Sequence, residues 1–364
     1  MLPRMKATGA QAPAKAKSAA ATEDPLAVAA AAGLRGVRGQ PRVVEVLRSA
    51  LVAGRPHHAY LFDGPAGTGK ATTARALMAA LNCQAPPAVG DACGECESCL
   101  KLSTGSHPDL ILVDMTLAGL ADEIEKLVRR LQFPPFEGQV QLVLIDPADA
   151  FAAPTAQTAA NRLLKTLEEP RPRTHFVLVT TAATALLSTI RSRCQRLRFA
   201  PLPDADLQQV LIDAHAVPSE LAASVSKLAQ GSLGRALQFV QDQDGLAKRQ
   251  QAAQELYQAA KEGRVGAMVS VASDAGADRE EAIETLDLLW LRLHEELMAA
   301  VARAGSGSGT RDPQVLRLLG AVQAVRDAQQ AIRRYTSAPL SLERLQRQLH
   351  PSLLGAAHGP GSHR

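Results

Sequence analysis

The sequence predicts an α/β domain built on a parallel sheet, followed by regions that are entirely helical. Strand-like runs recur at residues 59–63, 109–114, 140–146 and 175–181, with helical stretches between them. This alternation is typical of a parallel sheet with helices on both faces. The strand-like runs stop after Pro201, and only helical periodicity follows. A glycine-rich loop joins the first run to the first helix, which indicates a nucleotide-binding sheet.

That loop is the stretch GPAGTGKA, which fits the phosphate-binding pattern G-x-x-x-x-G-K. In such loops backbone N–H groups surround the phosphates and the lysine reaches the β- and γ-phosphates. The run AYLFD before it reads as a buried strand, and apolar residues at i, i+3, i+4 and i+7 after it read as a helix: Ala74, Leu77, Met78 and Leu81. We therefore predict a nucleotide site at Gly64, Gly67, Gly69 and Lys70.

One functional group of this loop is missing. The Ser or Thr that normally follows the lysine holds Mg²⁺, and this chain has Ala71. Thr72 is the neighbouring candidate, but it lies about 100° further around the helix and is a poor substitute. We expect ATP binding to be possible and Mg²⁺ coordination to be impaired.

The run VQLVLID ends in Asp146, the expected second Mg²⁺ carboxylate of a P-loop site. Hydrolysing relatives normally carry a glutamate next, which orients the attacking water. Here Pro147 follows, with neither a carboxylate nor an N–H. The direction of Asp149, three residues beyond Asp146, is open at this stage. The changes at Ala71 and Pro147 predict a weak or absent ATPase.

Four of the five cysteines form the pattern C-x9-C-x2-C-x2-C: Cys83, Cys93, Cys96 and Cys99. Thiolates two residues apart can grip one ion, and four complete a closed tetrahedral zinc site. Disulfides are disfavoured because no secretory signal is visible. An iron–sulfur cluster and unmetallated thiols remain open alternatives. The ferredoxin pattern, however, continues after C-x2-C-x2-C with three residues, a further cysteine and a proline, and this chain lacks that cysteine and proline. We predict a structural zinc module at about residues 83–103.

Charge is unevenly distributed along the chain. The net charge of +4 arises within residues 1–22, which hold four basic residues and no acid, so the remainder has 36 basic (40 minus 4) and 36 acidic residues. This balance argues against a domain that binds DNA through phosphates alone. Residues 1–27 are expected to be a disordered basic tail, which superficially resembles a transit peptide. The short apolar segment 25–32 cannot span a membrane, and we expect a cytoplasmic protein.

The helical part divides by helix length. Short helices are predicted over 201–246 and long ones over 247–354, with a flexible loop at 305–309 and a frayed tail at 355–364. The long helices carry apolar stripes that we expect to be core: Ile283, Leu286, Trp290, Leu293, Leu297 and Val301 in one, and Val315, Leu318, Leu319, Val322, Val325 and Ile332 in another.

Several segments, in order, carry a family resemblance. They are RPHHAYLFDGP at 55–65, the cysteine cluster, SHPDL at 106–110, NRLLKTLEEP at 161–170, TALLSTIRSRCQ at 184–195 and GSLGRAL at 231–237. Over roughly residues 34–240 the chain resembles the delta-prime subunits of bacterial DNA polymerase III clamp loaders, which are AAA+ proteins. The resemblance implies an AAA+ domain at 28–200, a helical lid at 201–246 and a helical collar at 247–354.

The same resemblance assigns roles to two arginines. Arg193, in the Ser-Arg-Cys motif, would act in trans as an arginine finger on the ATP site of a neighbouring subunit. A local ion pair is the alternative role for Arg193. Arg235 lies in the sensor 2 segment and could face this chain's own nucleotide. Thr180 and Thr181, at the end of the fourth strand, occupy the place of a sensor residue or simply end the strand.

The resemblance implies a non-motor clamp-loader subunit that helps to open a ring-shaped sliding clamp and to load it on primer-template DNA. Its partners would be the tau/gamma and delta subunits. An active ATPase of the tau/gamma type is one alternative, against which Ala71 and Pro147 argue. A zinc-dependent nucleic-acid-binding module is a second, against which the neutral charge of residues 23–364 argues.

Overall fold

The computed structural model describes residues 32–115, 120–153, 156–262, 279–308, 312–333 and 337–354. The two tails predicted to be disordered, 1–27 and 355–364, lie outside these ranges. Within the described ranges, none of the helices combines the length and the apolar character that crossing a bilayer requires.

Five parallel strands form one sheet in the order β2-β3-β4-β1-β5. The strands are β1 Ala59–Asp63, β2 Leu110–Asp114, β3 Gln141–Asp146, β4 Thr174–Thr180 and β5 Gln195–Arg198. The first four agree with the predicted runs to within one residue at each end. Strand β1 lies between β4 and β5 and is buried along its whole length, so the loop that follows it leaves from the middle of the sheet.

The fifth strand was missed by the sequence analysis. Its sequence, QRLR, holds one buried residue, Leu197, between exposed polar neighbours. It is an edge strand that pairs on one side only, with β1. Such a strand does not need the apolar run that marks a central parallel strand.

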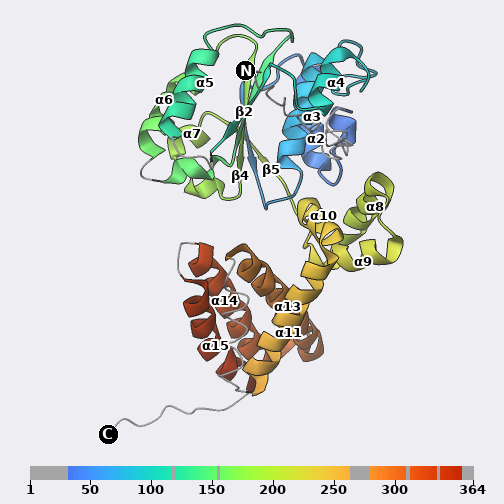
Figure 1. Cartoon of the computed structure of the whole chain (residues 1–364), viewed down its shortest axis with the longest axis vertical. Helices are drawn as coiled ribbons and strands as arrows, with labels where there is room; N and C mark the ends of the chain where they lie inside the picture. Colours follow the sequence, from blue (N-terminus) through green and yellow to red (C-terminus); the bar gives the residue numbers. More distant parts are fainter. Residues whose placement is uncertain are drawn as a thin grey trace, which may run out of the picture. The chain divides into compact units, whose positions relative to one another are not determined.

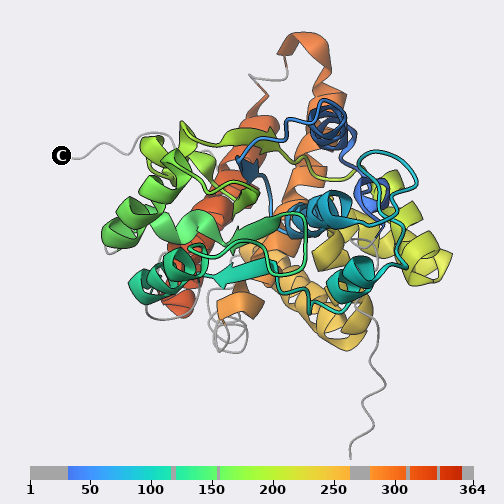
Figure 2. The same ribbon diagram turned by 90° about the horizontal axis from the view of Figure 1, so that it is seen from above.

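Helices cover both faces of the sheet, as predicted. One face carries α2 Pro41–Val52, α3 Lys70–Asn82 and α4 Glu97–Ser103, and the other carries α5 Leu120–Arg130, α6 Gln157–Glu168 and α7 Ser188–Arg191 (Figure 1). The green helices and the blue helices also lie on opposite sides of the strands in the turned view of Figure 2. Alternate residues of β1 feed the two cores: Tyr60 and Phe62 join the first, Ala59 and Leu61 the second. Short 3₁₀ turns, η1 Leu34–Gly36, η2 Ala148–Ala152 and η4 Ala183–Ala185, complete this unit.

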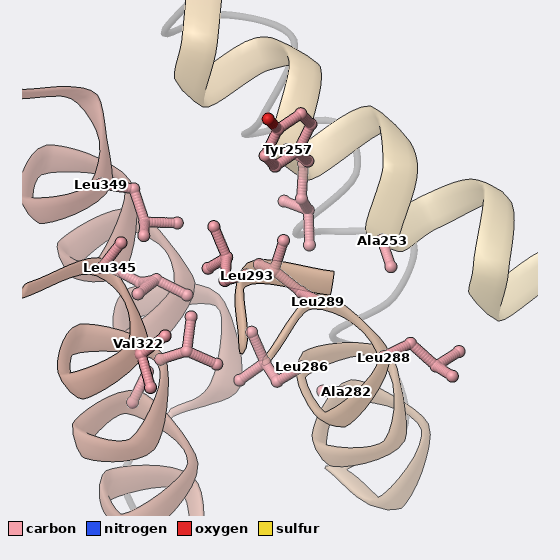
Figure 3. Packing of buried hydrophobic residues seen from close by; sticks show 14 of the residues in the cluster. Ala253, Tyr257, Ala282, Leu286, Leu288, Leu289, Leu293, Val322, Leu345 and Leu349 are labelled. Atoms are coloured by element: carbon pink, nitrogen blue, oxygen red, sulfur yellow. The ribbon is translucent and has the colours of Figure 1, made fainter. Parts of the chain in front are cut away.

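A third core, separate from the two on the sheet, is built by helices. Its helices are α8 Asp204–His215, α9 Ser219–Leu228, α10 Leu233–Gln241, α11 Gln243–Glu262, α13 Arg279–Ser308, α14 Pro313–Arg333 and α15 Ala338–Leu354. In Figure 3, Leu286, Leu289 and Leu293 of α13 point toward Val322 of α14 and Leu345 of α15. This burial explains why the apolar stripes of the long helices are present in the sequence.

Contacts divide the chain into two compact units at Phe199 and Ala200, with loop residues Pro65–Thr68 grouped with the second unit. The predicted lid and collar lie together in the second unit, and α11 begins at Gln243, before the predicted boundary at 246. The predicted division into three domains, with a lid separate from the collar, therefore remains a prediction.

Two expectations for the long helices were wrong in detail. Helix α13 continues to Ser308, so a loop does not begin at Gly305; the residues 309–311 lie outside the described ranges. Two members of the apolar stripes, Val301 and Leu319, are 39% and 45% exposed. The apolar stripes of the long helices therefore include residues that the helical core does not bury.

Candidate functional site

The glycine-rich loop follows β1 and ends where α3 begins at Lys70. Gly67 and Gly69 have φ angles of 72° and 87°, in the left-handed region that glycine adopts without strain. The Nζ of Lys70 donates a hydrogen bond to the carbonyl of Gly64 at 2.6 Å. Burial lowers the pKa of Lys70, and the carboxylates of Asp146, Asp149 and Asp63 partly offset that effect. The lysine is thus a buried cation, turned back onto its own loop and close to acidic groups.

The hydroxyl-bearing residues of the first turn of α3 do not replace the missing one at Ala71. Thr73 is fully buried, and its Oγ1 donates to the carbonyl of Gly69 at 2.7 Å. Thr72, judged a poor substitute from the sequence, lies half-buried beside it.

Asp146 ends β3, in register with Asp114 of β2. Burial raises the pKa of Asp146; Lys70 opposes this rise, while Asp149 adds to it. The carboxylate therefore lies beside the loop lysine, where a second Mg²⁺ carboxylate belongs. The roles of Asp146 and Lys70 in binding Mg²⁺ and nucleotide stay a prediction.

Asp149 does not stand in for the missing glutamate. Its carboxylate accepts hydrogen bonds from Thr180 Oγ1 at 2.8 Å and from the N–H of Thr181 at 3.1 Å. The hydroxyl of Thr180 in turn accepts from the N–H of Ala182 at 3.0 Å. Asp149 and the sensor position at the end of β4 are therefore hydrogen-bonded to each other.

The sequence analysis missed Asp63, the last residue of β1. Its carboxylate forms an ion pair with Arg196 of β5 and accepts from the N–H of Ala183 at 3.2 Å. This charge-assisted pair joins the edge strand β5 to the strand that carries the loop. The signal available in the sequence was an acidic residue at the end of a predicted strand. Its partner, Arg196, is 133 residues away along the chain and could not be identified from local sequence.

The four cysteines converge as predicted, between β1 and β2. Their sulfur atoms all lie within 4.8 Å of one another, and Cys93 Sγ is 3.9 Å from Cys99 Sγ. A tetrahedral ion with bonds of about 2.3 Å would hold its sulfurs about 3.8 Å apart. The N–H groups of Glu95 and Cys96 donate to Cys93 Sγ and lower its pKa to about 6. The group therefore fits a single metal ion.

Arg193 follows α7 and lies directly before the buried Cys194. Its guanidinium forms an ion pair with Glu168 at the end of α6 and donates to the carbonyl of Thr189 at 2.8 Å. The side chain remains 32% exposed. Arg193 therefore has a local partner and a surface position, and both roles considered for it from the sequence stay open.

Arg235, in the first turn of α10, has a partner within the helical unit. Its Nη1 lies 2.9 Å from the carboxylate of Asp287 on α13, and its guanidinium lies 5.3 Å from the centre of the Phe239 ring. The backbone N–H of Arg235 is capped by Ser232 Oγ at 3.2 Å. This ion pair between α10 and α13 gives Arg235 a structural role that the sequence did not predict.

The geometry is that of a five-stranded parallel sheet with a glycine-rich loop after β1 and an inserted four-cysteine group. Residues 39–203 match the family model described as DNA polymerase III, delta subunit. The DNA polymerase III subunit delta' of Bacillus subtilis is 38% identical over 180 residues, which are 49% of this chain and 53% of that protein. The similarity over residues 39–203 is therefore to subunits of bacterial DNA polymerase III.

Two further proteins also match this chain. The tau/gamma subunit of Haemophilus influenzae is 33% identical over 219 residues, or 59% of this chain and 31% of that protein. A gamma subunit-related protein of Thermotoga maritima, of known structure, is 15% identical with a TM-score of 0.42, over 85% of this chain and 99% of that one. This chain thus spans about a third to a half of the length of the curated relatives named here, and identity alone does not separate the delta-prime type from the motor type.

Proposed function

We propose that this chain is the non-motor, delta-prime-type subunit of a bacterial DNA polymerase III clamp loader. It would assemble with tau/gamma and delta subunits in the cytoplasm and help to open the sliding clamp and load it on primed DNA. The observation that carries the proposal is the state of its own ATP site. Ala71 and Pro147 replace two catalytic side chains, and the nearest spare carboxylate, Asp149, is bound to Thr180 and Thr181.

ATP hydrolysis requires both of the side chains that Ala71 and Pro147 replace. The Mg²⁺ that bridges the β- and γ-phosphates loses a ligand at Ala71, and the attacking water has no carboxylate to orient it at Pro147. What remains can bind a nucleotide: the loop amides, Lys70 and Asp146. We propose that any bound ATP is held weakly and is not turned over.

Arg193 is the group we propose to act on ATP, in the site of the neighbouring motor subunit. A guanidinium supplied in trans stabilises charge that develops on the transferring phosphoryl group. Support comes from its exposed position after α7 and from the Ser-Arg-Cys context. The ion pair with Glu168 would hold the side chain in the free subunit and be exchanged for phosphate oxygens in the complex.

We propose Zn²⁺ as the ion of the cysteine group. The short spacing of the four sulfur atoms suits one ion better than a multi-iron cluster, because a cluster is larger and separates its thiolates further. Four protein ligands leave no open position for substrate, so the metal would stabilise the insert and take no part in catalysis.

ATP turnover by the isolated chain tests the central claim. We expect a rate at background, and we expect that adding this chain to motor subunits, the clamp and primed DNA raises the rate of the assembled complex. A turnover on the order of 1 s⁻¹ by the chain alone would match competent phosphoryl-transfer enzymes and would support the tau/gamma-type alternative. Salt-sensitive binding to DNA by the isolated chain, abolished by a chelator, would instead support the zinc-dependent nucleic-acid-binding alternative.

A further inference from the structure

The phenylalanines of this chain divide sharply by exposure. Five of the seven are at most 3% exposed: Phe62, Phe151, Phe176, Phe199 and Phe239. The other two, Phe133 and Phe136, are 69% and 80% exposed, and both belong to the segment 132–139 that leads into β3. Two large apolar side chains exposed to water within four residues of each other form an apolar surface patch, and such a patch marks an interaction site.

The backbone of this segment, which we name the FPPF turn, is held in one conformation. The buried carboxylate of Asp109 accepts hydrogen bonds from the N–H groups of Phe136, Glu137 and Gly138 at 2.6, 2.9 and 2.7 Å. Pro134 and Pro135 restrict φ between the two phenylalanines. The exposed side chains are therefore presented by a preorganised loop, which lowers the entropy lost on binding.

The cysteine insert supports the same turn. Lys101 of α4, the helix that carries Cys99, forms an ion pair of 2.6 Å with Glu137. Ser98 of α4 is hydrogen-bonded to His107 at 3.1 Å, and His107 Nδ1 accepts from the N–H of Asp109 at 3.1 Å. The cysteine insert therefore also stabilises the FPPF turn, because α4 and Asp109 together hold the turn in place.

Three arginines border the turn. Arg130 donates to the carbonyl of Pro108 at 2.7 Å, Arg171 to the amide oxygen of Gln132 at 3.5 Å, and Arg173 to the carbonyl of Gln139. All three are exposed, and their hydrogen-bond acceptors are neutral. Among the ion pairs of the described residues, none joins these arginines to a carboxylate. The rim of the FPPF turn is therefore positively charged.

The turn lies away from the nucleotide loop. It precedes β3, whereas the loop follows β1, and these strands are parallel in one sheet. The two features therefore occupy opposite ends of the sheet. A ligand at the FPPF turn is not the nucleotide of this chain.

We infer that the FPPF turn docks a partner protein, inserting Phe133 and Phe136 into an apolar pocket bordered by carboxylates. Aromatic anchors with charged rims are the usual composition of binding hot spots. A nucleic acid could also stack on aromatic rings, but Glu137 lies next to Phe136 and residues 23–364 have no net charge, which favours a protein. Resting on the proposed function, we assign this partner as the sliding clamp.

The experiment measures binding of purified sliding clamp to the full-length chain on a biosensor. We compare wild type, the double variant Phe133→Ala/Phe136→Ala, Arg171→Glu, and the control Val52→Ala. Val52 lies on α2 of the same unit and is 66% exposed. We expect the double variant to raise Kd by on the order of 30-fold or more, the equivalent of about 2 kcal/mol for a hot-spot residue. Arg171→Glu should weaken binding and flatten its salt dependence, and Val52→Ala should bind as wild type.

Unchanged thermal unfolding of the double variant would show that the loss is local. The inference is overturned if the double variant binds the clamp as wild type does, or if the wild-type chain shows no clamp binding. It is also overturned if a single-stranded oligonucleotide binds the chain and loses affinity in the double variant. Assembly with the motor subunits is measured on the same preparations, so that failure of this inference can be distinguished from failure of the proposed function. Normal assembly without clamp binding refutes the inference alone, and failed assembly refutes the proposed function.

Discussion

Replacing Arg193 with alanine distinguishes a local ion pair from a residue that acts on a neighbouring subunit. In the isolated chain the guanidinium contacts Glu168 and Thr189, with 32% of the Arg193 side chain and 48% of the Glu168 side chain exposed. An ion pair at this level of exposure contributes about 0–1 kcal/mol to stability. We therefore expect Arg193→Ala to lower the free energy of unfolding by no more than about 1 kcal/mol, and to leave assembly with the motor subunits intact.

The expected effect on catalysis is much larger than the effect on stability. An arginine supplied in trans accelerates phosphoryl transfer about 10³–10⁵-fold, which corresponds to about 4–7 kcal/mol at the one ATP site that borders this subunit. The assay is clamp- and DNA-stimulated ATP hydrolysis by reconstituted complexes. The steady-state loss should be partial, because motor sites that do not border this subunit keep their own arginines. Arg193→Lys should fail nearly as badly, since an ammonium cannot make the planar two-pronged contact with phosphate oxygens.

Glu168→Gln is the matched control. It breaks the same ion pair but leaves Arg193 in place, so stability should change as in Arg193→Ala while ATP hydrolysis stays at the wild-type rate or rises. If Arg193→Ala assembles normally and hydrolyses ATP as wild type does, the trans role is wrong. Equal losses of activity in Glu168→Gln and Arg193→Ala would show that the ion pair itself is what matters.

The remaining predictions concern the metal, the nucleotide loop and the FPPF turn. Purified protein should carry about one zinc per chain, and Cys96→Ser should lose it and destabilise the insert while leaving nucleotide binding unchanged; elemental analysis that finds no zinc contradicts this. Under the proposed function, in which this site does not turn ATP over, Lys70→Ala should leave clamp loading by the complex nearly unchanged; a severalfold drop in loading would mean that bound nucleotide matters. Asp109→Ala should cost about 3 kcal/mol in chemical denaturation, since it leaves several N–H groups of the turn without an acceptor. Burial raises the pKa of Asp109, but the N–H groups of Phe136, Glu137 and Gly138 outweigh it, and the net pKa lies below the usual value. Its contribution is therefore complete above the unfolded pKa of about 3.9 and is lost as pH falls through the lower folded value, so Asp109→Asn should lose less stability than wild type in that acid range.

Local patterns in the sequence were sufficient for most of the fold and for part of the site. Four strands, the helices between them and the glycine-rich loop are each encoded within about ten residues, where periodicity and turn chemistry act. The cysteine group was equally predictable from the sequence, because a metal site of this kind requires its ligands at short and regular spacing. The two altered catalytic positions, Ala71 and Pro147, could be read directly from these motifs.

Tertiary structure decided which polar groups are engaged and which side chains stay exposed. Asp149 meets Thr180 across 31 residues and Asp109 meets the FPPF turn across 27 to 29, and no local pattern specifies such pairs. Strand β5 was missed for the same reason, since its pairing with β1 depends on a partner more than 130 residues away. Nothing in the sequence distinguished Phe133 and Phe136 from the five phenylalanines of the core, because exposure depends on how the whole sheet packs. The sequence therefore determined the chemistry available to this protein, and the packing of distant segments determined which of it is free to act.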